Sequence, residues 1–181
     1  MRKETLRMFI AAQLQPAALR ELAAFSARMK REFPGNYSRV ENFHITLAFL
    51  GDTLVSSVPT LEAIISGCCK NTPPVTLTLS GAGFFGNPVN AILWCGMDGA
   101  APLVDLSNRL REGLSAQGVR YDPKPMNPHI TLARKVDMNK ADIEKYRPAA
   151  LQSKADRISL YSSQRINGVL TYTPLTTTVL K

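Results

Sequence analysis

A heptapeptide of the form N-x-H-I-T-L-A occurs twice in the chain, at residues 42–48 and again at residues 127–133. The chain contains only two histidines, His44 and His129, and each one occupies the third position of a copy. Histidine is the side chain whose unperturbed pKa, about 6.5, lies in the physiological range. The repeat therefore predicts a paired site in which one imidazole acts as an acid and the other as a base.

The similarity between the two halves extends beyond the heptapeptides. In each half an apolar, strand-like run precedes an amphipathic helical pattern, the repeated strand follows, and a second helical segment and a β-rich run come after it. This order predicts an α+β fold, built from a duplicated β-α-β-α-β unit whose copies pack about a pseudo-twofold axis. Besides the repeats, the expected strands cover residues 6–14, 75–85, 91–99, 155–162 and 169–180, and the expected helices cover residues 16–29, 58–70, 101–114 and 139–147.

We expect a single domain over residues 1–181, in which one lobe covers roughly residues 1–86 and the other roughly residues 87–181. A duplicated unit of this kind allows strands to be exchanged between the lobes. Equivalent residues then face each other across the axis, so that His44 lies opposite His129.

Alternate residues of a strand point to the same side of a sheet. In the first copy His44 and Thr46 therefore share one face, while the aliphatic residues between and after them share the buried face. The second copy places His129 and Thr131 together in the same way. Each strand thus offers an imidazole and a hydroxyl, and two such half-sites facing each other enclose a gap.

The chemistry that suits this gap is displacement at phosphorus. Threonine hydroxyls can donate hydrogen bonds to anionic oxygens. A neutral imidazole can take a proton from an incoming water, while a protonated imidazole on the opposite side delivers one to the departing oxygen. Such a reaction needs no metal. A lone strand histidine is more often a satisfied core or surface residue, but the identities around both histidines argue against that interpretation here.

Two H-x-T-x motifs, His44–Leu47 and His129–Leu132, make the chain resemble a known family, the two-histidine (2H) phosphoesterases. Within that family it is similar to the bacterial and archaeal RNA 2′,3′-cyclic phosphodiesterases, formerly described as 2′-5′ RNA ligases. The resemblance covers nearly the whole chain, from RMFIAA through GFFGNPVNAILW to SSQRINGVLTYTPL. It implies a bilobal fold in which two antiparallel sheets face a central cleft with helices outside. It also implies that no cofactor is used and that a terminal 2′,3′-cyclic phosphate is hydrolysed to a 2′-phosphate.

The same resemblance implies a role for each residue of the repeats. His44 is then the proton donor and His129 the proton acceptor, although sequence symmetry alone does not assign these roles. Thr46 and Thr131 are the residues that hold the phosphate. The resemblance also favours Arg134 as a phosphate-binding residue.

The position of Arg134 argues in the opposite direction. It follows His129 by five residues, so a regular strand turns it away from the cleft unless a bulge or the end of the strand brings it round. Lys135 has the correct parity but lies one residue further along. An ordinary basic residue at a strand end is the alternative interpretation for both.

Charge and composition bear on the partner. The chain has 22 basic and 14 acidic residues, a net charge of +8. Residues 109–165 carry 12 Lys or Arg against 6 Asp or Glu. A basic surface attracts polyanions, although the same charge also serves solubility alone. Together, the basic charge and the family resemblance lead us to expect a monomer that acts on RNA or tRNA ends bearing a 2′,3′-cyclic phosphate.

The three cysteines and the hydropathy indicate a cytoplasmic location. Cys68 and Cys69 are adjacent, and neighbouring cysteines rarely bridge each other. Neither CxxC nor HxH occurs, so the sequence offers no typical zinc-ligand spacing. No apolar run approaches the ~18 residues of a membrane span. Gln13, Gln15 and Pro16 interrupt the early apolar run, which therefore fits a first strand better than a secretory signal.

The run GAGFFG at residues 81–86 matches the glycine pattern of dinucleotide-binding proteins. A strand-like segment follows it, whereas that pattern requires a helix, so we interpret these glycines as shaping a turn between the lobes. Phe84, Phe85 and Phe9 are candidates for stacking on an unstacked nucleobase, with core packing as the alternative.

Three functions remain open. The first is hydrolysis of the cyclic phosphate at RNA ends, with reversible 2′-5′ ligation as an extension. The second is another 2H reaction, such as cleavage of a 2′,5′-linked oligonucleotide, a small cyclic nucleotide or an ADP-ribose cyclic phosphate. The third is a non-catalytic module that binds RNA ends. Two intact His and Thr pairs argue against the third, because binding alone needs no pair of titratable groups.

Overall fold

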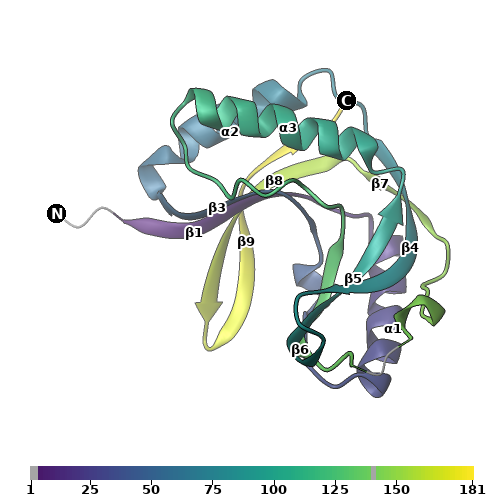
Figure 1. The fold of residues 1–181 in the computed structure, drawn as a ribbon. Coiled ribbons are helices and arrows are strands. Elements are labelled where there is room, and N and C mark those ends of the chain that lie inside the picture. The colour runs from purple at the N-terminus through teal and green to yellow at the C-terminus, as the bar shows by residue number, and fades with distance from the viewer. Residues whose placement is uncertain (1–3, 140–141) are drawn as a thin grey trace.

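The computed structural model describes residues 4–139 and 142–181, and its strands form two antiparallel sheets (Figure 1). The four-stranded sheet has the order β3-β1-β8-β9, and the five-stranded sheet has the order β2-β6-β5-β4-β7. These sheets confirm the predicted α+β class. The strands are β1 (Thr5–Ala12), β2 (Asn36–Tyr37), β3 (Ile45–Leu54), β4 (Val75–Phe85), β5 (Ala91–Asp98), β6 (Ile130–Val136), β7 (Gln152–Ala155), β8 (Arg157–Ile166) and β9 (Val169–Val179).

The described residues form three α-helices, which lie outside the sheets. In Figure 1, α2 and α3 lie across one face of the four-stranded sheet, and α1 stands beside the five-stranded sheet. Among the helices of the described residues, none is both long enough and apolar enough to span a membrane. The helices are α1 (Pro16–Glu32), α2 (Val58–Cys69) and α3 (Ala101–Ala116), and the 3₁₀ turns are η1 (Val40–Asn42), η2 (Val55–Ser57), η3 (Pro88–Asn90) and η4 (Ile143–Lys145).

The apolar periodicity of the helices determines which face each one buries. Four leucines of α3 lie at intervals of three and four residues, and all are fully buried: Leu103, Leu106, Leu110 and Leu114. The Ser107 hydroxyl, also on the buried side, donates to the Leu47 carbonyl over 2.6 Å. This contact fixes α3 against β3, and so supports the strand that follows His44.

Neither sheet is built from one half of the sequence. β4 comes from the first half but pairs with β5 and β7 in the five-stranded sheet. The hairpin of β8 and β9 comes from the second half but joins the four-stranded sheet through β1. We keep a single domain over residues 1–181 as the proposed organisation, since each sheet needs strands from both halves to be complete.

The second helical segment of the second half is not an α-helix in the described residues. Residues 140–141 of the expected range 139–147 lie outside them, and the rest contains only the short turn η4. Pro148 disfavours helical conformation at the preceding residue. The Tyr146 carbonyl accepts a hydrogen bond from the Ala82 amide over 3.2 Å, so this segment runs along β4 instead of coiling.

The glycines of GAGFFG do not form the expected turn between the lobes. Gly81 and Gly83 lie inside β4, and only Gly86, with φ of +84°, lies beyond the end of the strand. A β-carbon on Gly83 would overlap the indole of Trp94 on the neighbouring strand β5. Gly83 is therefore required for close packing of one large side chain. As expected, no dinucleotide-type helix follows, because η3 and the strand β5 come next.

The two repeated strands carry the same irregularity. In β3, Thr46 and Ala48 pair with adjacent residues of β1, which leaves Leu47 without an opposite residue. In β6, Thr131 and Ala133 pair with adjacent residues of β5, so that Leu132 is the extra residue. After each of these β-bulges, the side chains point to the opposite face from the one that regular alternation would give them.

Candidate active site

A cleft of about 660 Å³ is lined by residues from both sheets. Its walls include His44 and Thr46 from the first repeat, His129 and Thr131 from the second, and Arg134. The structure therefore brings all five residues that the sequence singled out to one cleft. As predicted, the aliphatic residues that alternate with them are buried: Ile45, Leu47, Ile130 and Leu132.

Both imidazoles are held in the same way by the chain just before them. His44 Nδ1 lies 2.7 Å from the Asn42 carbonyl oxygen, and His129 Nδ1 lies 2.6 Å from the Asn127 carbonyl oxygen. A carbonyl oxygen only accepts hydrogen bonds, so Nδ1 carries the proton in each ring. Nε2 is therefore the nitrogen left in each ring for proton transfer.

The two Nε2 atoms differ in their partners. His44 Nε2 lies 3.0 Å from Thr46 Oγ1, within its own repeat. Within the part of the chain that the structure describes, His129 Nε2 has no hydrogen-bond partner. The lone pair of His129 is thus the freer of the two to accept a proton.

Different aromatic residues surround the two rings. The His44 ring centroid lies 4.8 Å from that of Phe9, 5.2 Å from Tyr172 in an edge-on arrangement, and 6.5 Å from Tyr161. The His129 ring packs edge-on against Phe85 at 4.9 Å, with Trp94 behind at 6.5 Å. Phe9 and Phe85 are accordingly neighbours of the imidazoles. Phe84, the third aromatic candidate, packs against the core.

Burial and positive charge both favour neutral imidazoles in the free protein. Burial lowers the pKa of His44 to about 4, against the opposing effect of the Asn42 carbonyl, and the charges of His129 and Arg134 lower it further. The pKa of His129 is also lowered, first by burial and then by Arg134. A phosphate bound between the rings would act in the opposite direction, because an adjacent anion favours the protonated form.

NMR titration of the two histidine ring signals can check this electrostatic description. We expect both pKa values below 6.5, with His44 near 4, and both should rise when inorganic phosphate binds. The unfolded chain binds these protons more readily than the folded protein does, so the free energy of unfolding should fall as the pH drops from about 6.5 towards 4. A pKa at or above 6.5 for either ring without phosphate would contradict this description.

The cleft is strongly cationic. Five basic residues line it, and none of its lining residues within the described chain is acidic. Only one of the five, Arg39, has an ion pair among the described residues, an exposed one with Glu41. The five are Arg7, Arg39, Arg134, Lys135 and Arg165. Such a lining attracts anions and repels cations.

The bulge in β6 explains why Arg134 lies in the cleft. On a regular strand its side chain would point away, but the extra residue at Leu132 reverses the alternation after Thr131. The exception that the parity argument allowed, a bulge in the strand, therefore applies to Arg134. Lys135, with φ of +56°, also lines the cleft, at the end of the regular pairing.

Several cleft residues were not identified from the sequence. Arg7 could have been found, because it lies two residues before Phe9 on β1 and the intervening Met8 is fully buried. Tyr172 and Arg165 had no comparable signal. They reach the cleft only because the hairpin of β8 and β9 pairs with β1, a contact between the two ends of the chain.

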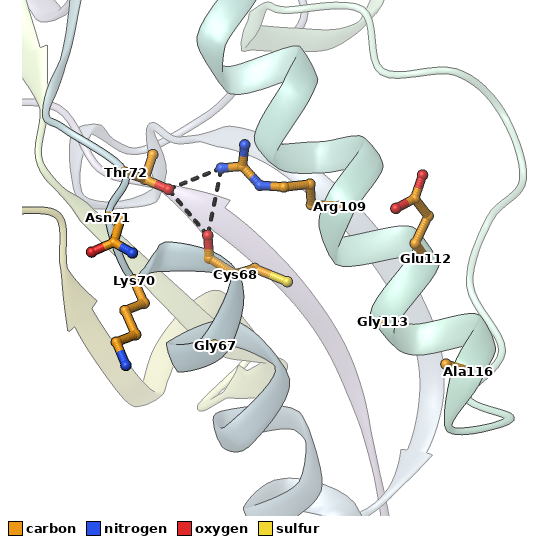
Figure 2. A pocket seen from close by; sticks show the side chains of 9 residues that line it. All are labelled: Gly67, Cys68, Lys70, Asn71, Thr72, Arg109, Glu112, Gly113 and Ala116. Atoms are coloured by element: carbon orange, nitrogen blue, oxygen red, sulfur yellow. Dashed lines mark hydrogen bonds between the residues drawn. The ribbon is translucent and has the colours of Figure 1, made fainter.

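A second, more open hollow lies between α2 and α3 (Figure 2). Arg109 extends across it and donates to Thr72 Oγ1 over 2.9 Å, with the Cys68 carbonyl 3.5 Å away. Its guanidinium thus joins the end of α2 to α3. Burial raises the pKa of the Cys68 thiol, which favours the unreactive protonated form. This hollow lacks the paired titratable groups of the cleft.

Comparison with known proteins identifies relatives of the chain. The sequence pattern of the 2′-5′ RNA ligase superfamily matches residues 14–167. The chain is 33% identical over 175 residues to an RNA 2′,3′-cyclic phosphodiesterase of Escherichia coli strain K12, covering 95% of each chain. It is 28% identical to a Thermotoga maritima protein of the same name over 87% of each chain. A Geobacillus stearothermophilus protein of that name is 33% identical over 129 residues, which span only 41% of its own length.

The fold is similar to that of solved structures. The crystal structure of E. coli LigT in apo form has a TM-score of 0.82 with 29% identity, and covers 98% of both chains. LigT complexed with 3′-AMP has a TM-score of 0.84 with 28% identity, over 98% of this chain and 99% of that one. These findings confirm the resemblance that the two H-x-T-x motifs indicated. The chain belongs to the 2′-5′ RNA ligase superfamily.

Proposed function

We propose that the chain hydrolyses the terminal 2′,3′-cyclic phosphate of RNA to a 2′-phosphate by two-histidine acid–base catalysis. The observation that carries this proposal is the arrangement of the cleft. Two imidazoles, each with Nδ1 occupied by a backbone carbonyl, line one cationic space whose lining contains no described acidic residue. Membership of the superfamily and the names of its curated relatives support the same reaction.

The proposed reaction proceeds by in-line displacement at phosphorus. Neutral His129 accepts a proton from a water molecule through Nε2 as the water oxygen forms its bond to phosphorus. The bond between phosphorus and the 3′ oxygen breaks on the opposite side. Protonated His44 donates its Nε2 proton to that oxygen, which leaves as a hydroxyl, while the phosphate remains on the 2′ oxygen.

The partners of the two Nε2 atoms support this assignment of roles. The freer lone pair belongs to His129, the proposed base, whereas His44 Nε2 lies beside Thr46 Oγ1. The lowered pKa of His44 means that it becomes an acid only once substrate is bound. The bound phosphate anion supplies the required shift, since it favours the protonated imidazole.

Phosphate binding falls to the residues between and beside the rings. Thr46 and Thr131 offer hydroxyl donors, and Arg134 offers a guanidinium suited to two phosphate oxygens at once. These contacts require no metal, and no cofactor takes part in the proposed steps. Crystal structures of E. coli LigT complexed with 3′-AMP and with phosphate show that a protein of similar fold binds such groups.

The test is hydrolysis of an oligoribonucleotide that ends in a 2′,3′-cyclic phosphate, with the product identified by phosphorus NMR or chromatography. We expect a 2′-phosphate as the only product, and no loss of rate in the presence of EDTA. A 3′-phosphate product would show that the 2′ oxygen leaves instead of the 3′ oxygen, and would contradict the proposed reaction. The absence of turnover with several RNA ends would leave binding as the function of the cleft.

A second reaction, 2′-5′ ligation, is compatible with the same groups, and the superfamily's name favours including it. A 5′ hydroxyl of another RNA takes the place of water, His129 accepts its proton, and the product is a 2′-5′ phosphodiester. Incubating a cyclic-phosphate donor with a 5′-hydroxyl acceptor checks this directly.

We further propose that the protein works as a monomer in the cytoplasm.

A further inference from the structure

One row of side chains crosses three strands on the cleft side of the four-stranded sheet. Arg7 of β1 is directly opposite Ser163 of β8, and Ser163 is directly opposite Tyr172 of β9. All three line the cleft. The strand residue next to Arg7, Met8, is fully buried on the other side, so the row belongs to the cleft face.

The row lies one step along the sheet from the aromatic residues next to His44. Phe9 and Tyr161, which are opposite each other, precede it, and two residues of a strand advance about 7 Å. Arg165 lies two residues beyond Ser163 on β8, and it also lines the cleft. Cationic and hydroxyl groups of the cleft lining therefore continue from the histidines along β8 towards the turn that joins β8 to β9.

Arg7 is available for a ligand. Its guanidinium carbon lies 4.7 Å from the centre of the Phe49 ring, and its side chain is exposed. Within the described residues it has neither a hydrogen bond nor an ion pair. Phe49 occupies the position in the first repeat that Arg134 occupies in the second. The neighbouring strand thus supplies the cation that the first repeat lacks.

Arg7 and Arg134 serve different parts of the cleft. The charge of Arg134 lowers the pKa of both imidazoles, so it lies near the reacting phosphate. Burial raises the pKa of Tyr172, and Arg134 and Arg7 both oppose that rise. Tyr172 lines the same cleft as both cations, and its ring packs edge-on against the His44 ring at 5.2 Å.

We propose that Arg7, Ser163 and Tyr172 form a second phosphate subsite, which binds the phosphodiester on the 5′ side of the terminal nucleotide. This inference rests on the proposed function, because it takes the terminal phosphate to lie between the histidines. Arginine and hydroxyl groups are the donors that phosphate oxygens accept best. The subsite makes an oligonucleotide a better substrate than a nucleoside 2′,3′-cyclic monophosphate, which has no second phosphate.

The test compares two substrates that share a terminal nucleoside, the cyclic mononucleotide and a trinucleotide ending in the same cyclic phosphate. For Arg7→Met we expect kcat/KM on the trinucleotide to fall roughly tenfold or more, as is typical for loss of a charged hydrogen bond. Activity on the mononucleotide should stay near that of the wild type. The salt dependence of kcat/KM on the trinucleotide should become shallower by about 0.7 in its logarithmic slope, the value for one phosphate contact on a single strand.

Two further variants complete the test. Arg7→Lys keeps the charge and should keep the wild-type salt slope. Arg31→Met removes the same charge from an exposed site at the end of α1, outside the cleft. It should leave kcat/KM on both substrates unchanged. Equal losses on both substrates would assign Arg7 to the terminal phosphate, and no loss on either would overturn the subsite. Failure of the proposed function is distinct, since the wild type would then hydrolyse neither substrate.

Discussion

Replacing His129 by alanine is expected to lower kcat/KM on a cyclic-phosphate RNA end by at least ~10²-fold, and replacing His44 should have an effect of similar size. Each variant removes one of the two proton transfers, while the cations that bind the substrate remain. The loss should therefore appear mainly in kcat. Steady-state kinetics on the oligonucleotide substrate measure both parameters.

Asn127→Ala is the matched comparison. It changes the same repeat but keeps the backbone carbonyl that holds His129 Nδ1, so we expect only a small loss. Thermal unfolding must accompany the kinetics, because the His44 ring packs against Phe9 and Tyr172. Full turnover by a folded variant lacking either histidine would refute the acid–base proposal.

The second large effect is expected at Gly83, which the sequence pattern assigns to a turn between the lobes. Gly83→Ala places a β-carbon into the space of the Trp94 indole, which packs beside Phe85 behind His129. Overpacking of this kind costs about 1–3 kcal/mol of unfolding free energy. We expect a lower urea midpoint and a lower kcat, since moving Trp94 displaces the support of the His129 ring.

Gly81→Ala is the control on the same strand. Its β-carbon would meet only the end of the Arg147 side chain, at 3.9 Å, so stability should stay close to that of the wild type. Trp94 is the only tryptophan of the chain, so intrinsic fluorescence follows its surroundings in both variants. If both alanine variants were equally stable, the packing role assigned to Gly83 would be wrong.

The sequence was sufficient to predict the paired half-sites because the information was local. The alternation within each H-I-T-L segment placed His44 and Thr46 on one face, and the repeat supplied their counterparts. The helical stripe of α3 followed from leucine spacing alone. These features depend on residues a few positions apart, which a single sequence displays directly.

Other features depend on contacts between distant segments. The bulge that brings Arg134 into the cleft appears only in the register between β6 and β5. Tyr172 joins the site through pairing of the hairpin with β1, at the other end of the chain. In the described residues the segment after β6 forms no α-helix, and its Tyr146 carbonyl accepts a hydrogen bond from Ala82 of β4. No local pattern signals these long-range pairings.

The central claim is that both imidazoles transfer protons at one phosphorus atom, and the pH dependence of kcat/KM for the wild type and the two alanine variants tests it most directly. The wild type should give a bell-shaped profile. The residual activity of His44→Ala depends only on a neutral base. Its kcat/KM should therefore rise with pH to a plateau, without the fall at alkaline pH. His129→Ala should lose the acidic rise instead. The account would be contradicted if both variants kept a bell-shaped profile. It would also be contradicted if His44→Ala lost the acidic rise and His129→Ala lost the alkaline fall.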